Sequence, residues 1–308
     1  SKVCDFGERY AHRFDLFSES EPFLQSADLP RQPPKRATDI KPVTYLMPEF
    51  PAGSEVTHYR HGMAEDNIFC PTCAARGLVT IPPFATSGGA GIKPSINGVP
   101  PIYILPGGNT LFESLVASLV LPDPRYQPAA ASIIEDATWW KRKPIVEHKA
   151  IVHEVSYLHS LTFPARRVRL HPELMDQPCS RCGQESTWGV RTMVYQMGES
   201  RPKDAPFWFD PFAAYRIRGE KEPVPIRPLE GKALWREYAA LFLPSADAEE
   251  SGESTKPPSV LYQLANEGLR DDVFIYPFRC IGMRTDMKAK VFEWIDAGFD
   301  VPLSLIHD

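Results

Sequence analysis

The apolar positions of this chain predict short elements separated by loops. The clearest helical spacing lies in residues 109–121, in which leucines recur every four residues, Asn109 is the expected cap and a proline ends the run. Residues 233–243 repeat this spacing, and a third helix is predicted for residues 289–298. The positions of the second helix expected to face the core are Leu234, Tyr238 and Leu241.

Alternating apolar and polar positions predict strands in residues 190–197 and 213–228. Proline accounts for 32 of the 308 residues, about twice its usual share, and this limits helix length. Residues 244–258 have almost no apolar content and are expected to form a mobile, acidic loop. The pattern therefore predicts one loop-rich α+β domain over residues 1–308, with short strands and few helices.

Composition places the chain among ordinary globular proteins. It is 43% hydrophobic and 24% charged, and no apolar run approaches the ~20 residues that cross a bilayer. The net charge of −5 argues against coating nucleic acid over the whole surface. The first ten residues lack the apolar core of a signal peptide, so a cytoplasmic location is expected.

Two CxxC pairs provide the strongest chemical pattern. Cys70 and Cys73 form one pair and Cys179 and Cys182 the other, and each spacing turns two thiolates toward one point. Together they predict a tetrahedral Zn²⁺ site. Four cysteines leave no coordination position for a catalytic water, so the zinc is expected to be structural. About a hundred residues separate the pairs, so the ion should join two distant loops of one domain.

Disulfides and a redox motif are the alternatives for these cysteines. Disulfides are disfavoured in a chain without a secretory signal. A redox CxxC normally occurs once, at the start of a helix, whereas this chain has two such pairs. The remaining cysteines, Cys4 and Cys280, are expected to be plain thiols.

A glycine-rich segment, residues 85–98, follows the first CxxC pair. Its glycines allow the backbone to approach a ligand closely, because no β-carbon stands in the way. Lys93 is placed to meet a phosphate, but the segment is no Walker A loop, since GxxxxGK[ST] is absent and Pro94 follows the lysine. A flexible surface loop is the alternative.

Several motifs together resemble one family. "RFDLFSESEPFLQ", "CPTC" with "SGGAGIKPSINGVPPIYILPGGNTLFESL", "TWWKRKP", "CSRCGQES" and "IGMRTDMKAKVFEW" occur in the order seen in CasA, the large subunit of the type I-E CRISPR surveillance complex Cascade. The resemblance runs from about residue 10 to residue 294. The N-terminal portion and the C-terminal four-helix bundle of the family are not found, so the chain resembles the central part of a CasA.

The resemblance implies a DNA-binding subunit without catalytic residues of its own. Such a protein recognises the protospacer-adjacent motif in duplex DNA, starts strand separation and helps to recruit a helicase-nuclease, while the guide RNA identifies the target. The implied partners are double-stranded target DNA, the guide RNA, the other Cascade subunits and that helicase-nuclease.

Three DNA-contacting elements carry over from the family. The glycine loop would lie in the minor groove, which is only ~6 Å wide and admits a bare backbone. A basic finger corresponds to Arg201 and Lys203, for which a solvated turn is the alternative. A hairpin wedge places Met287 and Lys288 at its tip, unless that hairpin packs on the core. The loop positions are Ser87, Gly88, Gly89, Ala90 and Gly91, followed by Lys93.

Residues 58–70 correspond to the family loop that docks on neighbouring subunits near the 5′ end of the guide. His58 and His61 are not expected to bind metal, because the cysteine set is complete.

Two other functions remain open. A zinc-ribbon RNA-binding module should show aromatic residues among basic ones, yet residues 205–212 are aromatic and carry no base. An HNH-type nuclease requires a compact His-Asn-His motif between its two CxxC pairs. The histidines of residues 146–159, which lie between the two pairs of this chain, have neither that pattern nor that spacing. Those histidines are His148, His153 and His159.

Overall fold

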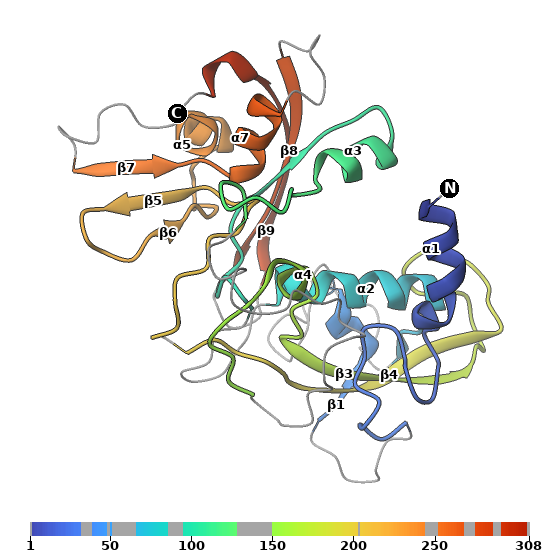
Figure 1. Ribbon diagram of the computed structural model, residues 1–308. Coiled ribbons are helices and arrows are strands. Elements are labelled where there is room, and N and C mark those ends of the chain that lie inside the picture. The colour runs from blue at the N-terminus through green and yellow to red at the C-terminus, as the bar shows by residue number, and fades with distance from the viewer. Residues whose placement is uncertain are drawn as a thin grey trace.

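The computed structural model consists of short helices and antiparallel strands (Figure 1). It describes residues 2–31, 39–47, 50, 66–85, 95–127, 150–202, 204–243, 252–267, 275–285 and 291–306. The helices are α1 (Lys2–Tyr10), α2 (Pro71–Phe84), α3 (Leu111–Ala117), α4 (Tyr157–Leu161), α5 (Tyr238–Phe242) and α7 (Ser259–Asn266). The strands are β1 (Ile40–Pro42), β2 (Tyr103–Pro106), β3 (Arg166–Leu174), β4 (Trp188–Met197), β5 (Tyr215–Arg218), β6 (Val224–Pro225), β7 (Glu253–Lys256), β8 (Ile275–Thr285) and β9 (Val291–Pro302). Single 3₁₀ turns lie at Ala11–Phe14, Val43–Leu46, Leu234–Glu237 and Leu303–Leu305. This mixed content confirms the predicted α+β class.

The first sheet, in the order β1-β4-β3, lies below α2 in the lower half of Figure 1. Its inner face and α2 form one core, in which Phe69, Phe163 and Leu78 are almost completely buried. Gly77 permits close packing there, because a β-carbon at this position would lie 2.6 Å from the Leu46 side chain. The helix therefore lies directly against the 3₁₀ turn that contains Leu46.

A second core lies in the upper half of Figure 1. The sheet β2-β8-β9 packs there against α5 and α7, and the sheet β6-β5-β7 lies beside it. The Phe242 ring of α5 has its centroid 5.8 Å from that of Phe278 and 5.5 Å from that of Phe299, on neighbouring strands. These aromatic contacts hold the helix on the sheet, since each buries a large apolar area.

The last residues of α2 connect the two cores. The Phe84 ring lies edge-on to Tyr103 of β2 at 5.5 Å and to Trp294 of β9 at 5.3 Å, measured between ring centroids. The Tyr103 hydroxyl also donates a hydrogen bond to the carbonyl of Pro83 at 3.0 Å. One end of α2 thus belongs to the first core, and the other end contacts the second sheet.

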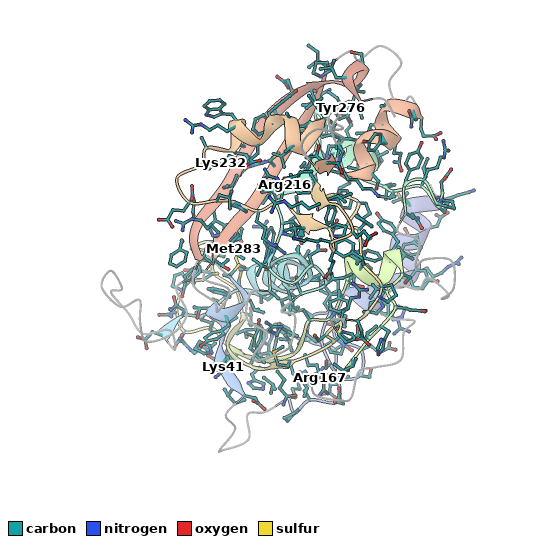
Figure 2. The ribbon with its side chains drawn as sticks, turned by 90° about the vertical axis from the view of Figure 1, so that its left-hand side faces the viewer. Lys41, Arg167, Arg216, Lys232, Tyr276 and Met283 are labelled. Carbon is teal, nitrogen blue, oxygen red and sulfur yellow. The ribbon has the colours of Figure 1, made fainter. Side chains whose placement is uncertain are left out.

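Ion pairs accompany the third sheet. Figure 2 shows Arg216 and Lys232 near one another, and both pair with the buried carboxylate of Glu237. Arg218 of β5 pairs with Glu253 of β7 at 2.8 Å. Residues 253–256 form this strand although they belong to the segment expected to be a mobile loop. The backbone of β5 supplies their hydrogen-bond partners, so apolar side chains are not needed; residues 244–251 lie outside the described ranges.

The helix expected at residues 289–298 is wrong. From Val291 onward the chain forms β9, which pairs with β8 from Ile275↔Pro302 to Thr285↔Val291. The apolar spacing there also fits an amphipathic helix, but the long antiparallel partner strand decides the outcome.

The other predicted elements are confirmed in part. The first helix is shorter than expected, and Thr110 caps it in place of Asn109 by accepting a hydrogen bond from the Glu113 amide at 3.1 Å. Its leucines are exposed. Residues 233–243 form a 3₁₀ turn followed by α5, whose Leu241 is fully buried as expected. Strands occur at both predicted places, as β4 and as β5 with β6.

Candidate metal centre

The first CxxC pair lies at the start of α2. Cys70 is the residue before the helix, Pro71 occupies the first helical position, and the Ala74 amide donates to the Cys70 carbonyl at 3.0 Å. Proline is favoured there because it has no N–H to leave unpaired and its φ suits the helix. This turn places the buried Cys73 thiol on the same side as Cys70.

The second pair lies in the turn between β3 and β4. The Gly183 amide donates to the Cys179 carbonyl at 2.8 Å, and the Cys179 amide donates to the Gln184 carbonyl at 2.9 Å. Gly183 has a φ of +73°, a conformation that residues with a β-carbon rarely adopt. The glycine after Cys182 therefore allows the chain to curl around the two thiols.

Backbone hydrogen bonds bring the two turns together. The Ser180 amide donates to the Ile68 carbonyl at 2.9 Å, and the Ile68 amide donates to the Ser180 hydroxyl at 3.0 Å. Phe69 and Val190 exchange two further bonds of 2.9 Å each. Segments more than a hundred residues apart thus form one small structure around the cysteines.

The four thiols lie close enough together to bind one metal ion. All four Sγ atoms lie within 4.8 Å of one another, and Cys70 Sγ is 3.7 Å from Cys182 Sγ. Zn–S bonds of about 2.3 Å would place the sulfurs about 3.8 Å apart. All six cysteines of the chain are described, and none is joined in a disulfide that would compete for these sulfurs. The residues present therefore fit Zn²⁺.

The surroundings of the thiols favour different protonation states. Burial raises the pKa of Cys70 and raises that of Cys73 to about 12. Burial also acts to raise the pKa of Cys179, but hydrogen bonds from the backbone of Cys70, Cys182 and Arg181 outweigh it and hold this pKa at about 6. The four cysteines would hold a divalent cation as thiolates, because the charge of the ion would compensate for theirs.

Most of the predicted DNA-contacting residues lie outside the described ranges. These residues are Ser87, Gly88, Gly89, Ala90, Gly91, Lys93, Lys203, Met287 and Lys288. Arg201 is described, and only 5% of it is exposed. Its guanidinium donates to the carbonyls of Pro206 and, at 3.5 Å, His153. A contact between Arg201 and DNA would require the side chain to leave these acceptors.

The described residues on either side of positions 86–94 and 286–290 lie on neighbouring elements. The loop follows directly from α2, which begins at the cysteine cluster. Met287 and Lys288 belong to the connection between the paired strands β8 and β9. Because Phe84 of α2 packs on Trp294 of β9, the base of the loop and the hairpin are in contact.

The histidines do not assemble with the cysteines. His159 is buried, and its Nε2 lies 2.5 Å from Glu199 Oε2, while its ring stacks on Phe163. His153 is exposed, and His58, His61 and His148 lie outside the described ranges. Among the residues that the structure describes, the group with metal-binding geometry consists of the four cysteines. Within the same residues, no helix has the length and apolar character to span a membrane.

Solved structures share this fold. The Cse1 proteins of Acidimicrobium ferrooxidans and Thermobifida fusca both superpose with a TM-score of 0.68 at 22% identity, covering 98% of this chain and 55% and 58% of theirs. A chain of a CRISPR RNA-guided surveillance complex superposes with a TM-score of 0.66 at 21% identity, covering 96% of this chain and 57% of that chain. The chain therefore has the α+β fold of Cse1 proteins.

Sequence comparison gives the family. A curated relative, the CRISPR-associated protein CasA/Cse1 of Thermus thermophilus, is 28% identical over 316 residues, which cover 99% of this chain and 56% of the relative. The model of CRISPR-associated protein Cse1 matches residues 1–308. The chain belongs to the CRISPR-associated Cse1 family, also called CasA, as its motifs indicated. It spans a little over half the length of the relatives it matches.

Proposed function

We propose that this chain is the part of a Cascade subunit that recognises the protospacer-adjacent motif in duplex DNA and starts strand separation. The observation that carries the proposal is the family match over the whole chain. The likeness to a chain of a CRISPR RNA-guided surveillance complex supports it. The guide RNA and the other Cascade subunits are the partners in this role, and the opened target recruits the helicase-nuclease.

The contact between α2 and β9 supports separate roles for two neighbouring elements: the loop would contact the minor groove, and the hairpin would separate the strands. A loop that enters the minor groove must be supported from outside the groove, and α2 ends directly before residues 86–94. A hairpin that separates strands must lie beside the base pairs that the loop contacts. The Phe84–Trp294 contact keeps the bases of these two elements together.

Zn²⁺ is the proposed ligand of Cys70, Cys73, Cys179 and Cys182. The ion would link the start of α2 to the turn between β3 and β4, and four thiolates would fill its coordination shell. Its role is structural in this proposal. The chain itself is proposed to act by binding, in the cytoplasm, and cleavage is assigned to the recruited helicase-nuclease.

Reconstitution tests the proposed function. This chain, co-expressed with the other Cascade subunits and a guide RNA, is expected to co-purify with them and to shift motif-bearing duplex DNA in a gel. An excess of unrelated RNA should leave that shift in place, whereas it would remove the shift of a zinc-ribbon RNA-binding module. Failure to enter the complex, or DNA cleavage that a point mutation in this chain removes, would contradict the proposal.

Met287→Ala and Lys288→Ala should have different effects. The wedge offsets the cost of unstacking a base step, so Met287→Ala should leave initial duplex binding intact and slow strand opening about tenfold. Lys288→Ala should weaken binding to all sequences and reduce the salt dependence by about one unit of slope. Affinity and opening rate are measured on duplex and on pre-opened bubble DNA at one salt concentration. If Met287→Ala opens duplex at the normal rate, the hairpin is not the wedge.

A further inference from the structure

A polar network lies where the two cores meet. Asn97 Nδ2 donates to Asp210 Oδ2 at 2.7 Å, and the Phe212 amide donates to Asp210 Oδ1 at 2.9 Å. The Asp210 amide in turn donates to the hydroxyl of the buried Tyr215 at 2.7 Å. Each carboxylate oxygen of Asp210 therefore has a donor, and one of these donors is the side chain of a residue 113 positions away in the chain.

This network holds the segment that follows the glycine loop. Residues 95–98 form a tight turn, in which the Ser95 hydroxyl donates to the Gly98 carbonyl at 2.7 Å and Gly98 has a φ of +69°. Asn97 is the member of this turn whose side chain reaches Asp210. Arg227 adds a second attachment, because its guanidinium donates to the carbonyls of Val99 at 3.0 Å and Asn97 at 3.4 Å.

The same network reaches the segment that precedes the loop. Asn97 Nδ2 lies 3.4 Å from the hydroxyl of Tyr103, which donates to the carbonyl of Pro83 in the last turn of α2. The residues on both sides of positions 86–94 are thus attached to one set of hydrogen bonds. The separation between the two ends of the loop depends on that set.

The charge of Asp210 has a cost that an apolar side chain would not have. Burial raises the pKa of Asp210 above its usual value, and the hydrogen bonds from Phe212 and Asn97, which lower it, offset only part of this rise. A partly buried carboxylate contributes to stability only if its hydrogen bonds compensate for its desolvation, and an apolar pair of similar size often stabilises a core equally well. The Asn97–Asp210 pair contributes a defined orientation, because its short hydrogen bond fixes the position of the turn of residues 95–98 relative to the segment that contains Asp210.

We infer that Asp210 is a positioning residue for motif recognition, acting through Asn97 to fix the end of the glycine loop relative to α2. The inference rests on the proposed function, in which the backbone of that loop contacts the minor groove. Asp210 itself touches no DNA in this account. Its effect is on the orientation of the loop, and therefore on duplex recognition and not on pairing between guide and target.

An exchange of the two side chains tests the inference. Asn97→Asp alone places two carboxylates against each other, and Asp210→Asn alone removes the charged acceptor. Each single variant, in the reconstituted complex, should lower affinity for motif-bearing duplex about tenfold. The double variant Asn97→Asp with Asp210→Asn restores one amide donor and one carboxylate acceptor, so affinity should return to within about threefold of the original. Affinity for single-stranded target should remain unchanged in all three.

Tyr126→Phe serves as the matched control. Tyr126 is a buried tyrosine whose hydroxyl donates to Glu267 at 2.9 Å and takes no part in the hydrogen bonds between Asn97, Asp210 and Tyr103. Removal of this hydroxyl should lower the melting temperature about as much as Asn97→Asp or Asp210→Asn does, but it should leave the affinity for duplex unchanged. If the control weakens duplex binding equally, the effect is one of stability and the inference is wrong.

Two further outcomes separate this inference from the proposed function. If Gly89→Asp removes duplex binding while Asn97→Asp and Asp210→Asn retain it, the loop recognises DNA but Asp210 does not position it. If Gly89→Asp has no effect on duplex binding, the proposed contact between the loop and DNA is wrong, and the role of Asp210 that rests on it is wrong as well. Loss of single-stranded binding in the single variants, or failure of the exchange to restore duplex affinity, would also overturn the role of Asp210.

Discussion

Gly89→Asp is expected to remove binding of motif-bearing duplex DNA by the assembled complex, with an affinity loss of at least about a hundredfold. The substitution adds a side chain where a bare backbone must enter the groove, and it places a negative charge near the phosphates. Pairing of the guide with a single-stranded target should persist, because RNA performs that recognition. The measurement compares duplex with single-stranded target at identical salt.

Gly7→Asp provides the control for added charge. Gly7 lies in α1, where a new β-carbon would meet no atom within 4 Å. This variant should bind duplex as the unmodified protein does. An equal loss of affinity for duplex and single-stranded target in Gly89→Asp would show that the loop is a structural element, and the minor-groove assignment would be wrong.

Removal of the metal should have the second large effect. The purified chain is expected to contain one zinc, and a strong chelator or Cys179→Ser should lower the melting temperature by about 10 °C or more, since structural zinc contributes several kcal/mol to folding. The loss would arise because the ion would cross-link two segments far apart in the chain, in addition to the hydrogen bonds that already join them. Metal analysis and thermal denaturation measure the two parts of the prediction.

Cys4→Ser is the matched variant for the metal site. Cys4 lies exposed in α1 and is not one of the four clustered thiols, so its loss should leave both zinc content and melting temperature unchanged. Zinc well below one equivalent, together with a melting temperature that a chelator does not alter, would refute the site.

The cysteine cluster could be predicted from sequence because its determinants are local. A CxxC spacing already brings two thiols together in a turn, and two such pairs leave few alternatives to a shared metal. The distance of about a hundred residues between the pairs did not obscure this. Each half of the site could be recognised without knowledge of the fold.

The elements that were predicted wrongly depend on the segments they pair with or pack against, which apolar periodicity does not reveal. Residues 291–298 have apolar spacing compatible with a helix, yet β8 supplies a strand with which they pair over their whole length. Leu111 and Leu115 were correctly placed in a helix, α3, but the described structure leaves them exposed at 76% and 58%; Leu119 lies beyond the end of this helix and is exposed at 63%. Helical periodicity predicts which side chains share a face, and not what that face contacts.

The Asn97–Asp210 pair had no sequence pattern to reveal it. Asp210 stands in an aromatic stretch that suggested core packing, and its partner lies 113 residues earlier. A single amide and a single carboxylate at such a separation carry no spacing that predicts contact. Asn97 and Asp210 come into contact only because the two cores pack against each other.

The length of α2 has a consequence for redesign of this protein. The helix has 14 residues, begins at the cysteine cluster and ends at the glycine loop, so it spans about 20 Å between the two. Insertion of one residue would turn everything beyond it by about 100° and advance it by about 1.5 Å. Under the proposed function, redesign of the motif preference would change side chains of the loop within the limits of its close approach to DNA, and it would have to keep the helix as a spacer of fixed length and phase.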